Sequence, residues 1–340
     1  MANIKKITFN TIKYIAFVSL GIFLFYLVTK EYKLSELFNL LFNFNKWYLL
    51  AVVIFSILSN ISRAMRWNML LEPMGYRVKL FNAFVSINIM YLANFFIPRG
   101  GEVARCGVLA KTDDVPFAKL VGTVIIERIA DVVMLVVLFF IVLITQSGVI
   151  SDFFHNNPGS FDKISKLFST RNIIIGIILI VTITFFFIVF RKKFRNNIIY
   201  KKLAGFYRNI VEGVKTIFGL KKPVYFILHT IFIYLMWFCM LFTFFKGFEP
   251  TSEFGMLVVI SVFVLSSLAM IVPVPAGMGA YHFTVASTLV LYGITFKEGI
   301  AFAFISHTAI NLYLDLFGLI GLLYFLYLVF LKSRNNTGAK

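Results

Sequence analysis

The sequence has few cysteines, few acidic residues and little charge of any kind. Cys106 and Cys239 are the only two cysteines, and both lie in apolar surroundings, which excludes a disulfide framework. Asp and Glu together number 15, and charged residues make up 14% of the 340 residues, whereas hydrophobic residues make up 60%. This composition excludes an ordinary soluble domain.

Sequence signals for metal binding and for nucleotide hydrolysis are also absent. The four His and two Cys show no metal-ligand spacing, and there is no Walker-type Gly-rich loop. We therefore expect no metal, no cofactor and no direct ATP hydrolysis. The net charge of +18 does not indicate a nucleic-acid partner, because membrane proteins collect Lys and Arg in their cytoplasmic loops.

The sequence does contain a series of long apolar runs. Several approach or exceed the ~20 residues that a helix needs to span a bilayer. These runs are Ile12–Val28, Tyr48–Ser62, Val121–Thr145, Ile173–Phe190, Val224–Phe245, Phe254–Val272 and Ile300–Leu331. The first has a basic flank but no convincing cleavage site, which favours a retained helix over a signal peptide. The sequence therefore predicts an all-α polytopic membrane protein.

The distribution of basic residues predicts a re-entrant hairpin in the first half. Residues 191–222 hold ten Lys and Arg against one Glu, so this amphipathic loop is expected to be cytoplasmic. The lysines near the N-terminus favour the same side. Both segments lie inside only if Phe81–Ala110 enters the membrane and returns to the same face. Pro98-Arg99-Gly100-Gly101 would then be its tip, because Pro and Gly interrupt a helix.

A second hairpin is predicted near the C-terminus, where Phe254–Val272 runs into Pro273–Gly279. It places the tail at residues 333–340 inside. On this topology 24 of the 33 Lys and Arg residues are inside and eight are outside, as the positive-inside rule requires. We therefore expect one transmembrane domain over residues 1–340, with about six spanning helices plus two re-entrant helical hairpins. Both termini would be cytoplasmic, in the plasma (cytoplasmic or inner) membrane.

The two hairpins suggest an inverted repeat with halves at about residues 1–150 and 165–332. Paired Gly/Pro interruptions in such repeats indicate a transport site near the midplane. Two unrelated kinks are the alternative. The residues expected at the hairpin tips are Asn94, Pro98, Gly100, Gly101, Pro273, Pro275, Gly277 and Gly279.

The first hairpin carries Arg99 at its tip, with Glu102 and Arg105 on one face of the returning helix. An internal ion network that holds the tip is one interpretation, since buried charges pair. One carboxylate cannot neutralise two guanidinium groups, however. The surplus positive charge and planar donor fork suit a phosphate.

Two further groups of charged residues lie in or at the end of apolar segments. Arg63 and Arg66 share a helix face, and they serve either as positive-inside anchors beside an interfacial Trp67 or as an inner gate that attracts phosphate. Glu127, Arg128 and Asp131 lie within about one turn of each other. They can neutralise each other, orient Arg128 or carry a proton, and the sequence does not choose among these.

The second hairpin and the last helix contribute His282, His307 and Asn311. Each histidine by itself is typical of a packed core residue. Together they could bind a headgroup or relay protons. The basic amphipathic pattern within residues 191–222 indicates a helix that lies on anionic phospholipid at the cytoplasmic face.

Four segments together resemble the lysylphosphatidylglycerol synthase transmembrane-region family. They are RAMRW at Arg63–Trp67, NFFIPRGGEVAR at Asn94–Arg105, VIIERIAD at Val124–Asp131 and PVPAGMGAYH at Pro273–His282. This flippase-like family also forms the membrane half of the multiple peptide resistance factor. The resemblance implies a module that moves aminoacylated phospholipid or a related lipid carrier between leaflets.

The chain departs from that family's pattern in two respects. It stops at Lys340 without the soluble aminoacyltransferase domain, so synthesis of a lysyl-lipid is not implied. It also has His282 and His307 where the better-known aminoacyl-lipid members look like they carry Glu and Arg. That both positions differ suggests that the Glu and the Arg were exchanged together. The difference argues against a lysyl-phosphatidylglycerol substrate.

The sequence therefore predicts a flippase for a phosphate-bearing lipid, either a phospholipid or a polyprenyl phosphate, rather than an enzyme. Arg99, Arg105 and Arg128 would hold the phosphate between the hairpins. Three carboxylates would orient these arginines: Glu102, Glu127 and Asp131. The alternatives are a membrane transferase with Glu102 or Glu127 as its base, and a non-transporting accessory subunit. An oligomer is possible under each.

Overall fold

The structure, a computed structural model, describes residues 18–30, 32–148 and 219–337. All regular elements in these ranges are helical, which confirms the predicted all-α class for this part of the chain. In chain order they are a helix at Val18–Thr29, α2 (Leu34–Phe42), α3 (Lys46–Leu71), η1 (Glu72–Met74), α4 (Leu80–Phe96), α5 (Gly101–Thr112), α6 (Phe117–Thr145), α12 (Pro223–Gly247), η2 (Glu249–Thr251), α13 (Met256–Ala269), η3 (Pro275–Gly277), α14 (Ala280–Val290) and α15 (Phe296–Thr337).

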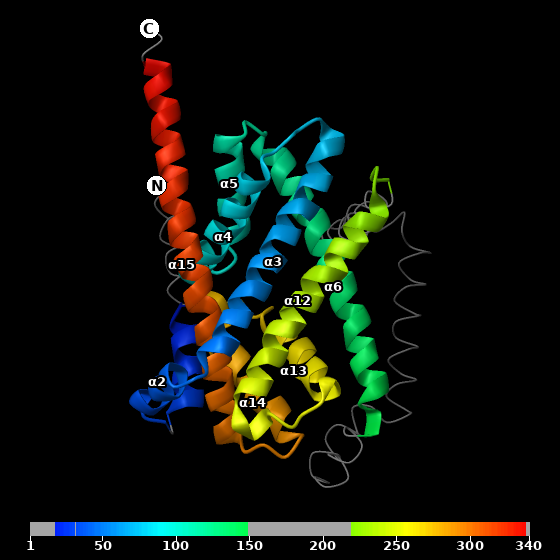
Figure 1. The fold of residues 1–340 in the computed structure, drawn as a ribbon, viewed down its shortest axis with the longest axis vertical. Helices are drawn as coiled ribbons and strands as arrows, with labels where there is room; N and C mark the ends of the chain where they lie inside the picture. Colours follow the sequence, from blue (N-terminus) through cyan, green and yellow to red (C-terminus); the bar gives the residue numbers. More distant parts are fainter. Residues whose placement is uncertain (1–17, 31, 149–218, 338–340) are drawn as a thin grey trace, which may run out of the picture.

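Within the described residues, four helices are long and apolar enough to cross a membrane: α3 with η1, α6, α12 and α15. In Figure 1 they run lengthwise through the molecule, while α4, α5, α13 and α14 are shorter. The chain is therefore a multi-pass membrane protein. The predicted span Ile173–Phe190, most of the basic loop at residues 191–222 and the tail beyond residue 337 lie outside the described residues, so the predicted total of six spans stays a prediction.

The first predicted hairpin is present as two helices, α4 and α5, with a break over residues 97–100. The Asn94 side chain bridges the break, because its Oδ1 accepts a hydrogen bond of 2.8 Å from the Gly101 N–H. A Cβ atom at Gly101 would lie 2.2 Å from the Met90 carbonyl oxygen. Glycine is therefore required where the returning helix crosses so close to α4.

The second predicted hairpin is also present, as α13 and α14 joined through η3. The connecting backbone enters the left-handed region at Ala276 (φ 48°), Gly277 (φ 72°) and Gly279 (φ 79°). A Cβ atom at Gly279 would also lie 2.5 Å from Leu24 Cβ, in the helix at Val18–Thr29. The Pro/Gly run thus forms a sharp turn against that helix.

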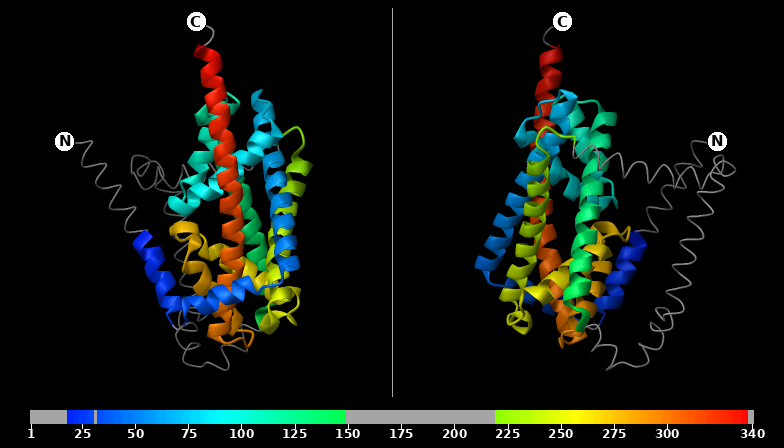
Figure 2. Two further views of the ribbon diagram at one scale, coloured as in Figure 1. Left: turned by 60° about the vertical axis from the view of Figure 1, so that its left-hand side comes forward. Right: turned by 90° about the vertical axis from the view of Figure 1, so that its right-hand side faces the viewer.

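The two hairpins lie in opposite halves of the molecule, and their tips face each other (Figure 2). Helix α15 runs past both and packs against α4 of the first and α14 of the second. At the tips, Arg99 Nη2 donates a hydrogen bond of 2.5 Å to the Ile271 carbonyl oxygen. The two interruptions are therefore in direct contact, although 172 positions separate these residues.

Loops that were predicted to share a membrane face lie at the same end of the molecule. Lys221, after the basic loop, lies 3.8 Å from Glu72, and Lys332 of α15 lies 2.7 Å from Asp114. At the other end, the Tyr32 hydroxyl donates a hydrogen bond of 2.6 Å to the carbonyl oxygen of Lys297, in the first turn of α15. The grouping of the loops agrees with the predicted topology, and the assignment of the first end to the cytoplasm stays a prediction.

The last apolar segment is a single helix of 42 residues, α15. The sequence left open a tilt, a kink near Gly318 or Gly321, or extension beyond the bilayer. At 1.5 Å per residue α15 is about 63 Å long, twice a ~30 Å hydrocarbon core, and Figure 1 shows its C-terminal end extending beyond the other helices. Gly318 serves close packing, since a Cβ there would lie 2.6 Å from Leu92 Cβ and 2.7 Å from the Asn88 carbonyl oxygen of α4.

We expect Gly318→Ala to lower the thermal unfolding temperature of the purified protein, because the added methyl group forces α15 away from α4 at a cost of about 1–3 kcal/mol. Gly122→Ala in α6 is the matched control, because a Cβ atom there meets nothing within 4 Å. The control should unfold at the same temperature or higher, since Ala favours a helix by about 0.5–1 kcal/mol. Equal behaviour of the two variants would contradict the close packing.

Candidate functional site

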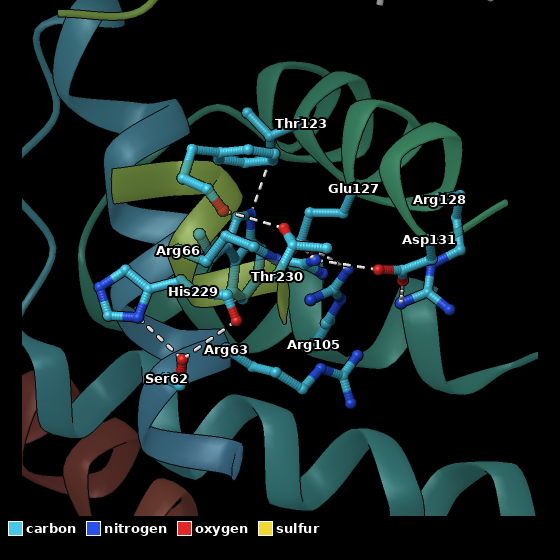
Figure 3. Close-up of polar contacts among 12 residues, drawn as sticks. Ser62, Arg63, Arg66, Arg105, Thr123, Glu127, Arg128, Asp131, His229 and Thr230 are labelled. Atoms are coloured by element: carbon cyan, nitrogen blue, oxygen red, sulfur yellow. Dashed lines mark hydrogen bonds and ion pairs between the residues drawn. The ribbon is translucent and has the colours of Figure 1, made fainter. Parts of the chain in front are cut away.

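Charged side chains from the three helices α3, α5 and α6 gather in one place (Figure 3). They are Arg63 and Arg66 of α3, Glu102 and Arg105 of α5, and Glu127, Arg128 and Asp131 of α6. We call this set the arginine cluster. The sequence presented these residues as three separate motifs, and the packing of α3, α5 and α6 brings the motifs together.

Glu127 is the centre of the arginine cluster. Its Oε2 accepts a hydrogen bond of 2.5 Å from Arg105 Nη2, and its Oε1 lies 3.5 Å from Arg66 Nη2. All three side chains are completely buried. Glu127 lies ten residues beyond Phe117, the first residue of α6, and therefore about 15 Å along a helix that is long enough to span a membrane.

Asp131 lies one helical turn further along α6 and holds two arginines. Its Oδ1 accepts a hydrogen bond of 2.9 Å from Arg66 Nη1, and its Oδ2 lies 3.1 Å from Arg128 Nη2. Arg66 Nη1 also donates to Thr230 Oγ1 of α12 at 3.1 Å. Arg66 is thus fixed by two carboxylates and a hydroxyl from the two neighbouring helices.

The interpretation of Arg63 and Arg66 as surface anchors is wrong. Helix α3 continues to Leu71, so both arginines lie inside the helix bundle and are buried. Trp67 is buried too, and its Nε1–H donates a hydrogen bond of 2.8 Å to Thr123 Oγ1. The Arg105 guanidinium lies 4.4 Å from the centre of a Trp67 ring, a cation–π contact, so this Trp packs against the cluster rather than at an interface.

Arg63 differs from the other arginines of the cluster because it has no carboxylate within 4 Å among the described residues. Its Nη1 donates to the Tyr91 hydroxyl of α4, and its guanidinium lies 5.5 Å from the Tyr91 ring and 5.8 Å from a Trp237 ring. Sequence analysis missed both aromatic residues, because an aromatic residue in an apolar helix is typical of the core.

The cluster has more positive than negative charge. In the described part of the chain it combines four guanidinium groups with three carboxylates. Arg63 Nε, Arg105 Nε and Arg105 Nη1 are buried donors without a hydrogen-bond partner there. Buried donors are costly when left unpaired, so these groups have both the charge and the free N–H directions to bind an anion.

The accessible edge of the cluster is formed by Arg128 and Glu102, which lie 3.9 Å apart. Their side chains are 43% and 28% exposed, whereas Arg66, Arg105 and Glu127 are not exposed at all. Glu102 therefore contacts Arg128 of the next helix, and not Arg105 on its own helix as its spacing had suggested. An approaching anion would meet Arg128 first.

Arg99 does not share the contacts of Arg105 and Arg128, with which the sequence had grouped it. It is exposed, and its guanidinium bonds to the Ile271 carbonyl oxygen at the second hairpin. Its backbone φ of 61° is in the left-handed region, which is uncommon for Arg. A backbone carbonyl as the acceptor leaves no signal in the sequence, so this contact was not predictable.

His282 and His307 lie together, with ring centres 4.8 Å apart, at the tip of the second hairpin. His307 Nε2 lies 2.8 Å from the Ala276 carbonyl oxygen, so it is the protonated nitrogen. His282 Nδ1 accepts a hydrogen bond of 3.4 Å from the Gly279 N–H, and its buried Nε2 has no partner among the described residues. The Asn311 side chain donates to the His307 carbonyl oxygen at 2.8 Å.

This histidine pair holds the left-handed backbone of the second tip in place. No group of three or more His, Cys, Asp or Glu side chains in the described ranges is arranged to hold a metal ion. Because His282 Nδ1 accepts a hydrogen bond, its Nε2 carries the proton, and this buried N–H is a donor without a partner among the described residues.

We expect Glu127→Gln to destabilise the protein by about 3–5 kcal/mol, because it leaves Arg105 buried without a counter-charge. Glu102→Gln, which removes a partly exposed partner at 3.9 Å, should cost less than about 1 kcal/mol. Thermal unfolding of both variants in the same detergent measures the difference. Two equal shifts would show that Glu127 does not hold the cluster, and Arg105→Met added to Glu127→Gln should restore part of the loss.

The comparisons with known proteins agree with the motif resemblance. The family model described as the lysylphosphatidylglycerol synthase TM region matches residues 14–331. UPF0104 membrane protein MJ1595 of Methanocaldococcus jannaschii is 28% identical over 135 residues, which are 38% of this chain and 40% of that relative. The chain thus spans well under two thirds of this curated relative, and no solved structure matches it. Since the family match covers nearly the whole sequence, the chain belongs to the lysylphosphatidylglycerol synthase TM-region family.

Proposed function

We propose that this protein is a flippase, which moves a lipid with a phosphate-bearing headgroup between the two leaflets. The observation that carries the proposal is the surplus of buried guanidinium groups in the arginine cluster. Charge inside a membrane segment costs several kcal/mol, and it marks a substrate path more often than a structural need. A phosphate supplies the negative charge that the described carboxylates leave missing.

The proposed headgroup contacts follow from the unpaired donors. Arg128, at the exposed edge, receives the phosphate, and the free N–H groups of Arg63 and Arg105 bind it further in. Guanidinium groups suit this task, because their planar fork bonds to two phosphate oxygens at once. Glu127 and Asp131 fix Arg105 and Arg66 while the lipid tails stay in the bilayer. In this arrangement the carboxylates orient the arginines and do not act as catalytic bases.

The proposed movement uses the two hairpins as an inverted repeat. Each half of the described chain runs as long helix, hairpin, long helix, through α3 to α6 and α12 to α15. The contacts correspond as well: α15 packs against the first helix of the α4–α5 hairpin, and α6 packs against the first helix of the α13–α14 hairpin. Repeats of this kind alternate by moving one unit against the other. The Arg99 contact with Ile271 would open and close as the hairpins move.

The substrate class that fits best is a phospholipid or a polyprenyl phosphate in the plasma membrane. The family model names a lipid synthase region, which supports a lipid as the cargo. His282 and His307 take part at the second tip, where the unpaired His282 Nε2–H is placed to donate a hydrogen bond to the same headgroup.

The first test reconstitutes the full chain in vesicles that contain fluorescent phosphatidylglycerol or fluorescent polyprenyl phosphate in one leaflet. The proposal predicts that the protein exposes the probe to a membrane-impermeant quencher on the opposite side. It also predicts that the mass of the recovered lipid is unchanged. A lipid of altered mass would instead indicate a transferase. The absence of both lipid movement and lipid modification would indicate an accessory subunit.

We expect Arg63→Gln to slow this lipid movement about ten- to a hundredfold, because hydrogen bonds to charged groups contribute about 1.5–3 kcal/mol. Arg63 has no carboxylate partner in the described ranges, so its loss leaves no acid uncompensated and the protein should stay folded. Lys119→Gln removes an exposed positive charge over the Tyr76 ring and is the matched control, with transport expected to persist. Full transport by a folded Arg63→Gln variant would refute the proposed site.

A further inference from the structure

A second polar site lies away from the arginine cluster, where α15 passes the outer end of the first hairpin. The structure has a cavity of about 200 Å³ there, between the start of α4, the end of α5 and the C-terminal part of α15. Lys79, Lys111 and Lys332 line it, one from each of the three segments. Asn82 and Thr112 add polar groups, and Tyr324 belongs to its apolar wall on α15.

The charges around this cavity favour an anion. The ammonium groups of Lys79 and Lys111 have no carboxylate within 4 Å in the part of the chain that the structure describes. Lys332 pairs with Asp114 at 2.7 Å, but the two side chains are 47% and 77% exposed, so this ion pair is weak and can be exchanged.

The nearest other acid, Asp113, is already engaged by hydrogen-bond donors. The Lys79 N–H donates to its Oδ1 at 3.2 Å, and the Asn82 side chain donates to its Oδ2 at 3.0 Å. The Thr112 hydroxyl also donates to Oδ2, at 2.6 Å. This carboxylate therefore stays in place at the rim, and the cavity keeps an excess of positive charge beside it.

The apolar wall distinguishes a lipid headgroup from a free phosphate ion. The Tyr324 ring packs edge-on against Phe81, with ring centres 5.2 Å apart, and Phe81 is 57% exposed. The cavity is smaller than the roughly 300 Å³ at which sites for whole small molecules begin. It therefore accommodates a headgroup phosphate, with the acyl chains on the exposed apolar surface beside Phe81.

We infer that this cavity binds the phosphate of an anionic phospholipid from the leaflet at this end of the molecule. The bound lipid joins α4, α5 and α15 through the three lysines, and so ties the first hairpin to the long last helix. None of its lining residues belongs to the arginine cluster. The site is therefore a regulatory lipid site that stands apart from the proposed transport site and does not depend on it.

The test uses the full chain in a neutral detergent and measures how fast an amine-reactive reagent labels individual lysines, read by mass spectrometry. Dioctanoyl phosphatidylglycerol should slow the labelling of Lys79 and Lys111 several-fold. Lys119 and Lys221 are internal controls, because they are exposed at the same end but do not line the cavity. Equal protection of all four lysines, or of none, would overturn the inference.

Two further probes separate the possible ligands. Dioctanoyl phosphatidylcholine, which has no net charge, should protect weakly, and sn-glycerol 3-phosphate, which has no tails, should not protect at equal concentration. Protection by sn-glycerol 3-phosphate equal to that by phosphatidylglycerol would overturn the lipid assignment and indicate a site for a free phosphate compound.

Two double variants compare the affinity for phosphatidylglycerol, independently of the ligand series above. Lys79→Gln with Lys111→Gln should weaken phosphatidylglycerol binding about 25-fold, at about fivefold for each lysine. Lys119→Gln with Lys221→Gln removes the same charge at the same end and should leave binding unchanged. The protection of Lys79 and Lys111 reports on this cavity alone, because both lysines line it, so lipid bound at the arginine cluster would not conceal the result. Similar losses in the two lysine pairs would show that general surface charge, and not the cavity, attracts the lipid.

Discussion

The ion pairs of Glu127 with Arg105 and Arg66 are the interaction on which the rest of the site depends. They join the returning helix of the first hairpin to α3 and α6 at a fully buried position. One carboxylate between two guanidinium groups cannot neutralise both. Asp131 completes the coordination of Arg66, but Arg105 retains two unpaired nitrogens and Arg63 has no described acid partner. The contact that stabilises the hairpin therefore also leaves the capacity to bind an anion.

The two hairpins contribute different chemistry to this arrangement. The first supplies charge through α5, while the second supplies a histidine pair and a tip of left-handed backbone. Their tips are in contact through a hydrogen bond from Arg99 to the Ile271 carbonyl oxygen and through packing of α4 against η3, and α15 packs along both hairpins. In the proposed transport movement, one hairpin shifts against the other and the contacts between their tips change. The lysine-lined cavity lies where α15 leaves the first hairpin, so its ligand can limit that movement.

Much of the fold could be predicted from the sequence, because two simple physical signals determine it. Charge counting required two segments to turn back, and Pro98, Gly101 and Gly277 marked where they do. The grouping of the site residues was harder to predict from the sequence. Arg63 and Arg66 fitted either surface anchors or an inner gate, because only the packing of α3 against α6 and α12 shows that they are buried. The partners of Arg63 are ordinary aromatic residues, and the partner of Arg99 is a backbone carbonyl, and neither type of partner has a sequence signature.

The most direct measurement is a high-resolution electron cryomicroscopy structure of the full chain in lipid nanodiscs that retain native lipid. The central claim is that the arginine cluster binds a lipid phosphate. It predicts a headgroup phosphate within hydrogen-bond distance of Arg128 and of Arg63 or Arg105, with Glu127 still between Arg66 and Arg105. A structure with lipid resolved around the protein but with the cluster closed, and its arginines in contact only with carboxylates and aromatic rings, would contradict the claim.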